Sequence, residues 1–438
     1  MSDEMPNAEE YEQQARLLMD EGKYNEALRE TSDGFRTDAS YMPLYHLAVA
    51  CLREIGGDEE RALFENVLEN PNEAQGYYKI GAHFITYSDY DLGLPFIEKA
   101  FKMDPDNEYY AYDLSVCYGS RFDIQKAYDT LVRFEDSEDI AVRIRLAYLN
   151  ILLGQTEGVG EELMKLAKEI PPSVDNYSSV LEVLKVDHMN MRQDALENPQ
   201  VDIMDWHFIQ YGGVLLNIFG ESDEEFEVAG GRFVALWLSM EQVQRTLANL
   251  LVLLKALGKV PENLFYIDDR DSEILARALG QMLNLYPVPV EEKHTDIKKS
   301  LIVAAEADSF QTEEYFFLKF QQEDQVLFAF NQNWLQDLSI CPDITGFLTQ
   351  SIGLPWQGGE LKMDTDEDGE VISSPTDDRK PEVIAQELAV EEYEIDEEFE
   401  ELLGFYTDFS EFLKINHAQI KTRFEFAVES PVPGSYFH

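Results

Sequence analysis

Apolar positions recur with a period of about 34 residues through roughly the first 170 positions of the chain. The clearest copy, 74–107, has two segments with helical spacing, separated by a polar turn. It ends at Asp104-Pro105, where proline cannot continue a helical hydrogen-bond ladder. Weaker copies begin near Ala8, Tyr41, Glu108 and Ile140. The pattern predicts about five helix pairs over 8–172, each burying its apolar face against its neighbours.

Small residues occupy the eighth and twentieth positions of the copies, as at Gly81 and Gly93. Small side chains allow the two helices of a pair to approach closely. Ala15 with Ala27 and Ser115 with Ala127 repeat this feature. Together the period and the small residues resemble the tetratricopeptide repeat family, a match that covers about two-fifths of the chain.

The resemblance implies a groove lined by the first helix of each pair. Its lining positions would be Arg16, Met19, Tyr78, Ile85, Tyr109, Tyr112, Val116, Ile144, Tyr148 and Ile151. An aromatic and apolar groove favours a hydrophobic peptide or helix as partner. The Lys, Asn and Arg set with which family members clamp a C-terminal carboxylate is missing from these positions. The alternative is that the groove is covered by the protein's own C-terminal half.

The pattern changes after Pro172. Residues 173–201 are predicted to form a capping helix and linker, since the last unit of an array must shield its outer face. Over 202–358, short β-type runs alternate with helices, which predicts an α/β domain with a mostly parallel sheet. Strands are expected at 214–219, 233–238, 263–267, 286–290, 300–305 and 325–330, and helices at 240–257 and 271–285. The fold class is therefore a multidomain α+β protein, with an all-α solenoid followed by an α/β domain.

One turn of the predicted α/β domain has the composition of an anion site. Asp268, Asp269, Arg270 and Ser272 lie between a strand and a helix N-terminus, a place where phosphate can bind. Residues 269–290 also faintly resemble one helix of the phosphoribosyltransferase fold, in its competence-associated branch. The loop diagnostic of that family is absent, because the strand 301–305 leads into Glu306-Ala307-Asp308. The alternative is a capped helix in an ordinary α/β domain.

The C-terminal region is strongly acidic and then aromatic. From 360 to 401 there are eighteen acidic residues against three basic ones, so 359–396 is predicted to be a flexible acidic linker. Asp364 to Gly369 copies half of a calcium loop, but the twelfth position is Pro375. Residues 397–438 are predicted to form an amphipathic aromatic helix, which would dock on the protein itself, and a tail.

Charge and motifs narrow the function. The chain has 34 basic and 86 acidic residues, a net charge of −52, which disfavours nucleic acid and anionic membranes and suits a basic partner or a salt-rich cell. Three cysteines without a CxxC pair, and no signal peptide or membrane-length apolar run, predict a cytoplasmic protein without membrane insertion. No catalytic motif, metal-ligand spacing or cofactor-binding fingerprint is present.

We therefore expect a non-enzymatic adaptor that binds a protein or peptide, with a basic segment or an apolar helix, in its tyrosine-lined groove. One alternative is a nucleotide- or sugar-phosphate-binding α/β enzyme for which the repeats serve as a targeting module. A further alternative is a structural scaffold in a salt-rich cell.

Overall fold

The computed structural model describes most of the chain. The described residues are 7–170, 180, 183–185, 187, 191, 202–217, 232–294, 298–320, 324–359, 361–363, 371–389, 395, 397–416 and 422–431. They form two compact units. The first is Met1–Leu184 with Glu429–Pro431, and the second is Lys185–Val428 with Val432–His438.

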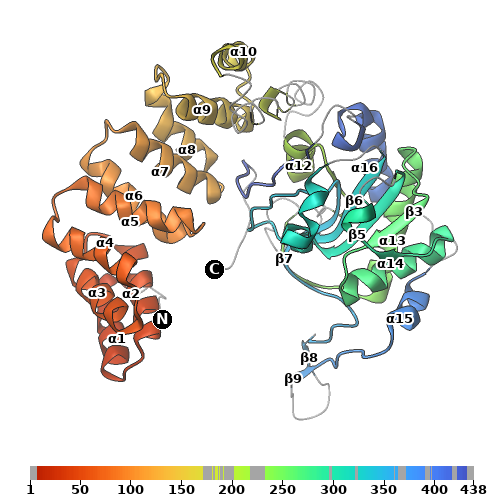
Figure 1. The fold of residues 1–438 in the computed structure, drawn as a ribbon, viewed down its shortest axis with the longest axis horizontal. Helices are drawn as coiled ribbons and strands as arrows, with labels where there is room; N and C mark the ends of the chain where they lie inside the picture. The colour runs from red at the N-terminus through yellow and green to blue at the C-terminus, as the bar shows by residue number, and fades with distance from the viewer. Residues whose placement is uncertain are drawn as a thin grey trace. The chain divides into compact units, whose positions relative to one another are not determined.

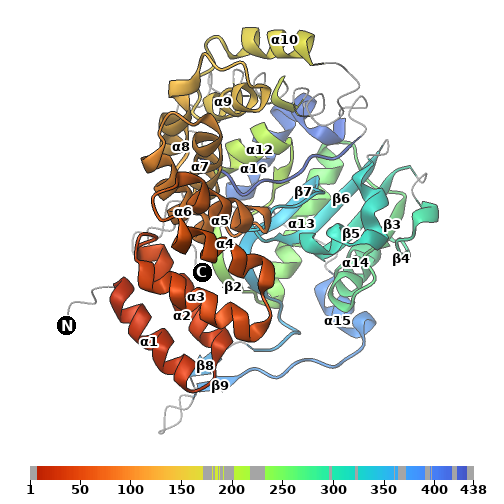
Figure 2. The same cartoon turned by 60° about the vertical axis from the view of Figure 1, so that its left-hand side comes forward.

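The first unit is an array of five helix pairs, coloured red to yellow in Figures 1 and 2. Each helix packs closely against the other member of its pair, and successive pairs stack, as α2 on α3 and α6 on α7. The helices are α1 (Ala8–Asp20), α2 (Tyr24–Thr37), α3 (Met42–Ile55), α4 (Asp58–Glu69), α5 (Ala74–Thr86), α6 (Tyr90–Met103), α7 (Glu108–Ser120), α8 (Ile124–Leu131), α9 (Ile140–Leu152) and α10 (Val159–Glu169). The predicted helical array is confirmed, and each predicted copy of the repeat corresponds to one pair.

Polar side chains begin several of these helices. Asn7, Asp89, Asn107, Asp123 and Asp139 each accept a hydrogen bond from a backbone N–H in the first turn. Such caps satisfy N–H groups that have no partner within the helix. They fix where each helix begins and keep the pairs in register with the sequence repeat.

The close approach of paired helices is visible at Gly81 and Gly93. A β-carbon on Gly81 would lie 3.0 Å from the carbonyl oxygen of Gly93 and 2.5 Å from Cδ1 of Ile97. A β-carbon on Gly93 would lie 3.1 Å from the carbonyl oxygen of Gly81. Each helix therefore leaves room for the backbone of the other, which is the role predicted for the small residues.

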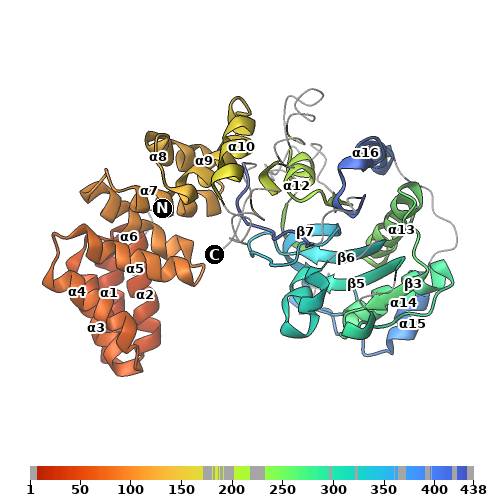
Figure 3. The same cartoon turned by 45° about the horizontal axis from the view of Figure 1, so that its top comes forward.

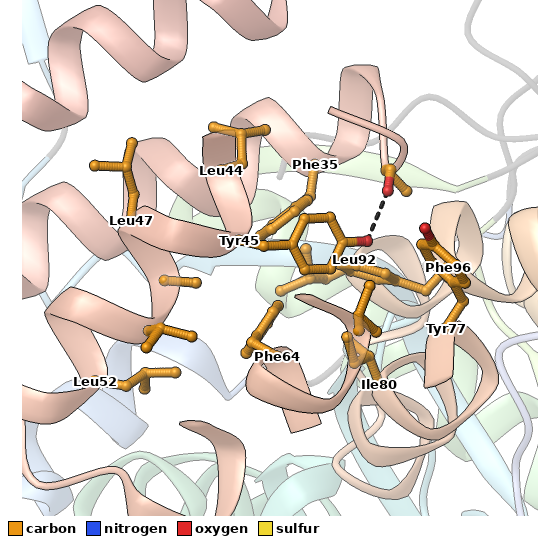
Figure 4. Packing of buried hydrophobic residues seen from close by; sticks show 14 of the residues in the cluster. Phe35, Leu44, Tyr45, Leu47, Leu52, Phe64, Tyr77, Ile80, Leu92 and Phe96 are labelled. Atoms are coloured by element: carbon orange, nitrogen blue, oxygen red, sulfur yellow. Dashed lines mark hydrogen bonds between the residues drawn. The ribbon is translucent and has the colours of Figure 1, made fainter. Parts of the chain in front are cut away.

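A cluster of aromatic side chains lies among the aliphatic residues in the core of the first three pairs (Figure 4). The ring of Phe35 lies 4.8 Å from that of Tyr45 and 5.0 Å from that of Phe96. The Tyr45 hydroxyl donates to the carbonyl of Ala39 at 2.6 Å, and the Tyr77 hydroxyl donates to the carbonyl of Pro71 at 2.9 Å. Buried tyrosines need such an acceptor, and here they tie each loop to the helix that follows it.

The second unit is built on a parallel sheet flanked by helices (Figures 1 and 3). Among the described residues the strand order is β1-β7-β6-β5-β3-β4, with β2 also paired to β7. The strands are β1 (Val214–Leu215), β2 (Phe233–Trp237), β3 (Asn263–Tyr266), β4 (Val288–Pro289), β5 (Ser300–Glu306), β6 (Gln325–Gln332) and β7 (Ile344–Gly353). The helices that precede or connect them include α12 (Ile203–Tyr211), α13 (Met240–Ala256) and α14 (Arg270–Leu283), and α14 packs on β3 and β5. The mostly parallel sheet is confirmed.

The central strand β7 was missed by the sequence pattern. Its apolar residues are interleaved with Thr345, Gly346 and Thr349, so no continuous apolar run marks it. Both threonines are completely buried, and a β-carbon on Gly346 would clash with the carbonyl oxygen of Phe330. One edge of β7 is shared by β1 at its start and β2 at its end. Close packing against β6 therefore selected small residues where a strand pattern needs bulky ones.

The predicted acidic linker is in part structured, so the flexible-linker prediction is wrong for that part. Within 359–396 lie α15 (Pro381–Leu388) and the antiparallel pair β8 (Leu361–Met363) and β9 (Val371–Ser373). Helix α15 packs on α14, and its Ile384 and Leu388 side chains are fully buried. The high charge of the segment concealed this short apolar face. The half calcium loop, 364–369, and most of the predicted capping segment, 173–201, lie outside the described residues.

The aromatic C-terminal segment forms α16 (Glu397–Asp408), which ends before the predicted limit at Lys414 and is followed by short 3-10 turns at Ser410–Phe412 and Lys414–Asn416. Its Phe405 ring lies 5.3 Å from Phe208 of α12, and the buried Tyr406 hydroxyl accepts a hydrogen bond from the Leu215 N–H at 2.9 Å. The helix therefore docks within its own α/β unit, where it contacts α12 and β1.

Candidate functional site

The predicted groove residues lie on first helices of the pairs. The set is Arg16 on α1, Tyr78 and Ile85 on α5, Tyr109 and Tyr112 on α7, and Ile144 and Tyr148 on α9. Tyr109 is 61% exposed, whereas Ile144 is 9% exposed and belongs to the core. Tyr78, Ile85, Tyr112 and Tyr148 are half-buried. Four of the predicted positions thus combine packing with access from outside, which a peptide-binding surface requires.

At Tyr78 the surface is already organised. The Tyr78 ring lies 4.5 Å from the ring of Tyr110 on the next first helix. Burial, together with the neighbouring Asp113 carboxylate, raises the pKa of Tyr78. Burial also raises the pKa of Asp113, while the hydrogen bond from Tyr78 opposes that shift. At this part of the surface, Tyr78 of α5 contacts Tyr110 and Asp113 of α7.

Arg145, on α9, is the principal feature that the sequence pattern missed. The residue is only 8% exposed. Its Nε donates to the Ser115 hydroxyl at 3.2 Å and its Nη2 to the Ser115 carbonyl at 2.8 Å, so α7 holds one edge of the guanidinium. Its Nη1 donates to Oε2 of Glu429 at 2.5 Å. Burial opposes the charge of Arg145, but Glu429 outweighs it and the pKa of Arg145 is raised.

The surroundings of this ion pair belong to the predicted groove. Arg145 lies 5.5 Å from the ring centre of Tyr148, and Tyr112 also interacts electrostatically with it. A signal was present in the sequence, because 140–152 is apolar apart from two arginines and an asparagine. Arg143 pairs with Glu162 of α10 at 2.6 Å, whereas the partner of Arg145 lies 284 residues away. Residue spacing along the chain does not reveal a partner at this distance.

The residues of the turn predicted to bind an anion form hydrogen bonds within the protein instead. Asp269 accepts from the N–H of Ser272 at 2.8 Å and from its hydroxyl at 2.6 Å, capping α14. The Ser272 hydroxyl also accepts from the Ala305 N–H at 2.8 Å. Arg270 donates to the carbonyls of Asp377 and Arg379 at 2.5 and 3.1 Å, and the Asp268 N–H donates to the Tyr315 hydroxyl at 3.2 Å. These contacts occupy the donors that an anion would need.

Carboxylates gather at the same edge of the sheet, where parallel strands end. Burial is the main cause that raises the pKa of Glu306, at the end of β5, to about 7, and Asp308, Asp271 and Asp269 add to the shift. Asn331, at the end of β6, donates to Glu306 at 2.8 Å. Such a site repels phosphate. The phosphoribosyltransferase resemblance is therefore not supported, because acidic groups stand where that family needs a phosphate-cradling loop.

A hollow of about 400 Å³ lies beside α14 in this unit and is lined in part by Arg277, Tyr286 and Glu382. Arg277 is paired with Glu273 at 2.6 Å and with Glu382 at 3.2 Å, so its charge is neutralised. The hollow therefore offers an anion no uncompensated positive charge.

In the described part of the chain, no three or more His, Cys, Asp or Glu side chains converge as metal ligands, and no helix has both the length and the apolarity to cross a bilayer. Cys51, Cys117 and Cys341 are free and buried. Burial raises the pKa of each thiol, to about 11 for Cys51 and about 12 for Cys341, so none is activated as a nucleophile at neutral pH.

Comparison with known proteins finds similar solved structures, and those given below cover 37–43% of this chain. No family model and no curated protein matches the chain. Similar solved structures include a MamA RS-1 variant (22% identity, 37% of this chain and 93% of that one, TM-score 0.24) and pilF of Pseudomonas aeruginosa (11%, 43%, 85%, 0.27). Another is YrrB, described as a tetratricopeptide repeat protein with an unusual peptide-binding site (15%, 41%, 91%, 0.26). These neighbours are tetratricopeptide repeat proteins, as the repeat pattern of the N-terminal part predicts.

Proposed function

We propose that the protein is a non-enzymatic adaptor of the cytoplasm that binds a peptide segment of a partner protein on the first helices of its repeats. The observation that carries the proposal is the half-buried pair Tyr112 and Tyr148 around Arg145, on neighbouring first helices. Tyrosine anchors give a large contact area for little loss of side-chain freedom.

The charge of the protein supports a partner that is basic outside the bound segment. A net charge of −52 attracts such a partner from a distance and raises the rate of encounter. Half-buried aromatic rings then provide the short-range contacts. The α/β unit is proposed to support this role, because its turn at 268–272 is engaged in capping and its acidic edge disfavours nucleotides and sugar phosphates.

Capture from native lysate by full-length protein tests the proposal. The wild type is compared with the double variant Tyr112→Ala/Tyr148→Ala and with the control variant Tyr286→Ala. Tyr286 is 77% exposed and lies in the α/β unit, so its loss changes a tyrosine surface without touching the repeats. We expect the double variant to lose a partner that the wild type and the control retain, with unchanged helical circular dichroism. Retention of every specific partner by the double variant would refute the groove as the binding surface.

A further inference from the structure

Arg145 is a buried cation whose guanidinium is held in place by α7, independently of its carboxylate partner. Ser115 accepts two hydrogen bonds from one edge of the guanidinium, through its hydroxyl and its carbonyl. Nη1 then points to a single carboxylate, that of Glu429, whose side chain is 11% exposed. A buried charge without a counter-ion is strongly unfavourable, so this arrangement requires a negatively charged ligand.

The helix opposite Arg145 leaves space for that carboxylate. A β-carbon on Gly119 would lie 2.6 Å from Cδ of Glu429 and 2.6 Å from Nη2 of Arg145. Glycine therefore stands where any other side chain would fill the place of the ligand. Ser115 and Gly119 lie one turn apart on α7, so one face of this helix supplies both the anchor of the arginine and the opening beside it.

The group seated in this place is a short peptide segment. By their contacts, Glu429 to Pro431 belong to the repeat unit, whereas the chain up to Val428 belongs to the α/β unit. The three residues are neither helix nor strand, and Ser430 is 8% exposed. The repeats thus already hold a piece of their own chain by a charged side chain, next to the tyrosines proposed to bind partners.

We propose that Ser115, Gly119 and Arg145 form a carboxylate-binding subsite of the groove, that Glu429 is its resident ligand, and that a partner peptide binds by replacing Glu429 with its own Asp or Glu. This inference rests on the proposed function and names the chemistry of the partner segment. The resident ligand belongs to the same chain, so it acts at a high effective concentration. A partner therefore needs the aromatic contacts as well as the carboxylate.

The test uses the full-length chain with Glu429→Ala, in which the subsite is vacated. Two fluorescent peptides of residues 426–433 serve as probes, one with the natural glutamate and one with glutamine in its place. We expect the glutamate probe to bind the variant at least tenfold more tightly than the glutamine probe, because hydrogen bonds to a charged acceptor are about twice as strong as neutral ones. We also expect it to bind the variant at least tenfold more tightly than the wild type, whose subsite is occupied.

The matched control is Glu425→Ala. Glu425 lies in the same C-terminal stretch but pairs with Lys319 at 2.7 Å and belongs to the α/β unit, so this variant should bind the probes as the wild type does. Melting followed by circular dichroism at 222 nm checks the folding of the helical repeats, and tryptophan fluorescence checks the α/β unit. Trp206, Trp237, Trp334 and Trp356 all lie in the α/β unit, so their transition should not change. If Glu429→Ala fails to fold, Glu429→Gln removes the charge and keeps the shape.

The outcomes are distinct. Equal binding of both probes, or binding of neither to a folded variant, would overturn the subsite and leave Arg145–Glu429 a purely structural ion pair. If the wild type bound the glutamate probe as tightly as the variant does, competition by Glu429 as the resident ligand would be refuted. Partner capture that depends on Tyr112 and Tyr148 would survive either result, so failure of this inference is separable from failure of the proposed function.

Discussion

Replacing Gly119 with alanine should destabilise the repeats, although the same change usually stabilises a helix. Alanine is favoured over glycine inside a helix by about 1 kcal/mol. The new β-carbon, however, would stand 2.6 Å from both Arg145 Nη2 and Glu429 Cδ. Ser115 holds the guanidinium from the other side, so Glu429 must move away.

The two opposing effects can be compared. Overpacking costs about 1–3 kcal/mol, and a buried ion pair that loses one partner costs about 3–5 kcal/mol. Because Glu429 is displaced only in part, the cost should lie between that of overpacking and that of a lost ion pair. Subtracting the gain in helix propensity leaves an expected net destabilisation of about 1–3 kcal/mol. For a unit of this size that corresponds to a fall in the melting temperature of roughly 2–12 °C.

Thermal unfolding followed by circular dichroism at 222 nm measures the effect. The matched control is Gly404→Ala in α16, where an added β-carbon has nothing within 4 Å. That variant should melt at or slightly above the temperature of the wild type. A cycle with Glu429→Ala should be clearly non-additive, since the two residues share one contact. If Gly119→Ala were as stable as Gly404→Ala, or if its effect added fully to that of Glu429→Ala, the close approach of Glu429 to α7 would be refuted.

Three further changes test the α/β unit. Burial raises the pKa of Glu306 to about 7, so the contribution of Glu306 to folding stability is complete below its unfolded pKa and is lost as the pH rises through 7. The wild type should therefore lose up to about 3 kcal/mol of unfolding free energy between about pH 4.5 and 7 through this group, and Glu306→Gln should not show this loss when unfolding by urea is measured across that range. Tyr406→Phe leaves the buried N–H of Leu215 without an acceptor and should cost about 1–3 kcal/mol, measured by tryptophan fluorescence in urea; an unchanged midpoint would contradict the hydrogen bond. Arg423 and Asp343 form an ion pair at 3.3 Å with both side chains at least 96% buried, so Arg423→Ala should cost about 3–5 kcal/mol, and a loss below 1 kcal/mol would show that the pair is hydrated.

Local patterns sufficed for much of the fold. Apolar spacing within a short window predicts the repeat helices, β5, β6 and α16. The small residues Gly81 and Gly93 predict the close contact between their two helices. Strand β7 was not predicted, because packing against neighbouring strands determines its residues and no apolar run marks it. Helix α15 was not predicted, because its apolar face is short and surrounded by charged residues.

The sequence predicted the tyrosines of the candidate site but not the ion pair of Arg145. The half-buried tyrosines Tyr112 and Tyr148 follow from repeat position, since each repeat presents the same face of its first helix. The chemistry of Arg145 does not follow, because its partner is set by tertiary structure and not by spacing. The turn at 268–272 shows the converse, since residues suited to an anion were needed to cap α14 and to hold the neighbouring segments.

The distance along the chain between Arg145 and Glu429 also sets an order of events during synthesis. The repeats close through contacts between neighbouring pairs, so they can fold while the ribosome is still translating the rest of the chain. Strand β1 must wait for β7, since Val214 pairs with Ile344. Arg145 waits for Glu429, because this carboxylate is made 284 residues later. The nascent repeats therefore pass through synthesis with an unmatched buried cation, and only a chain translated as far as Glu429 completes them.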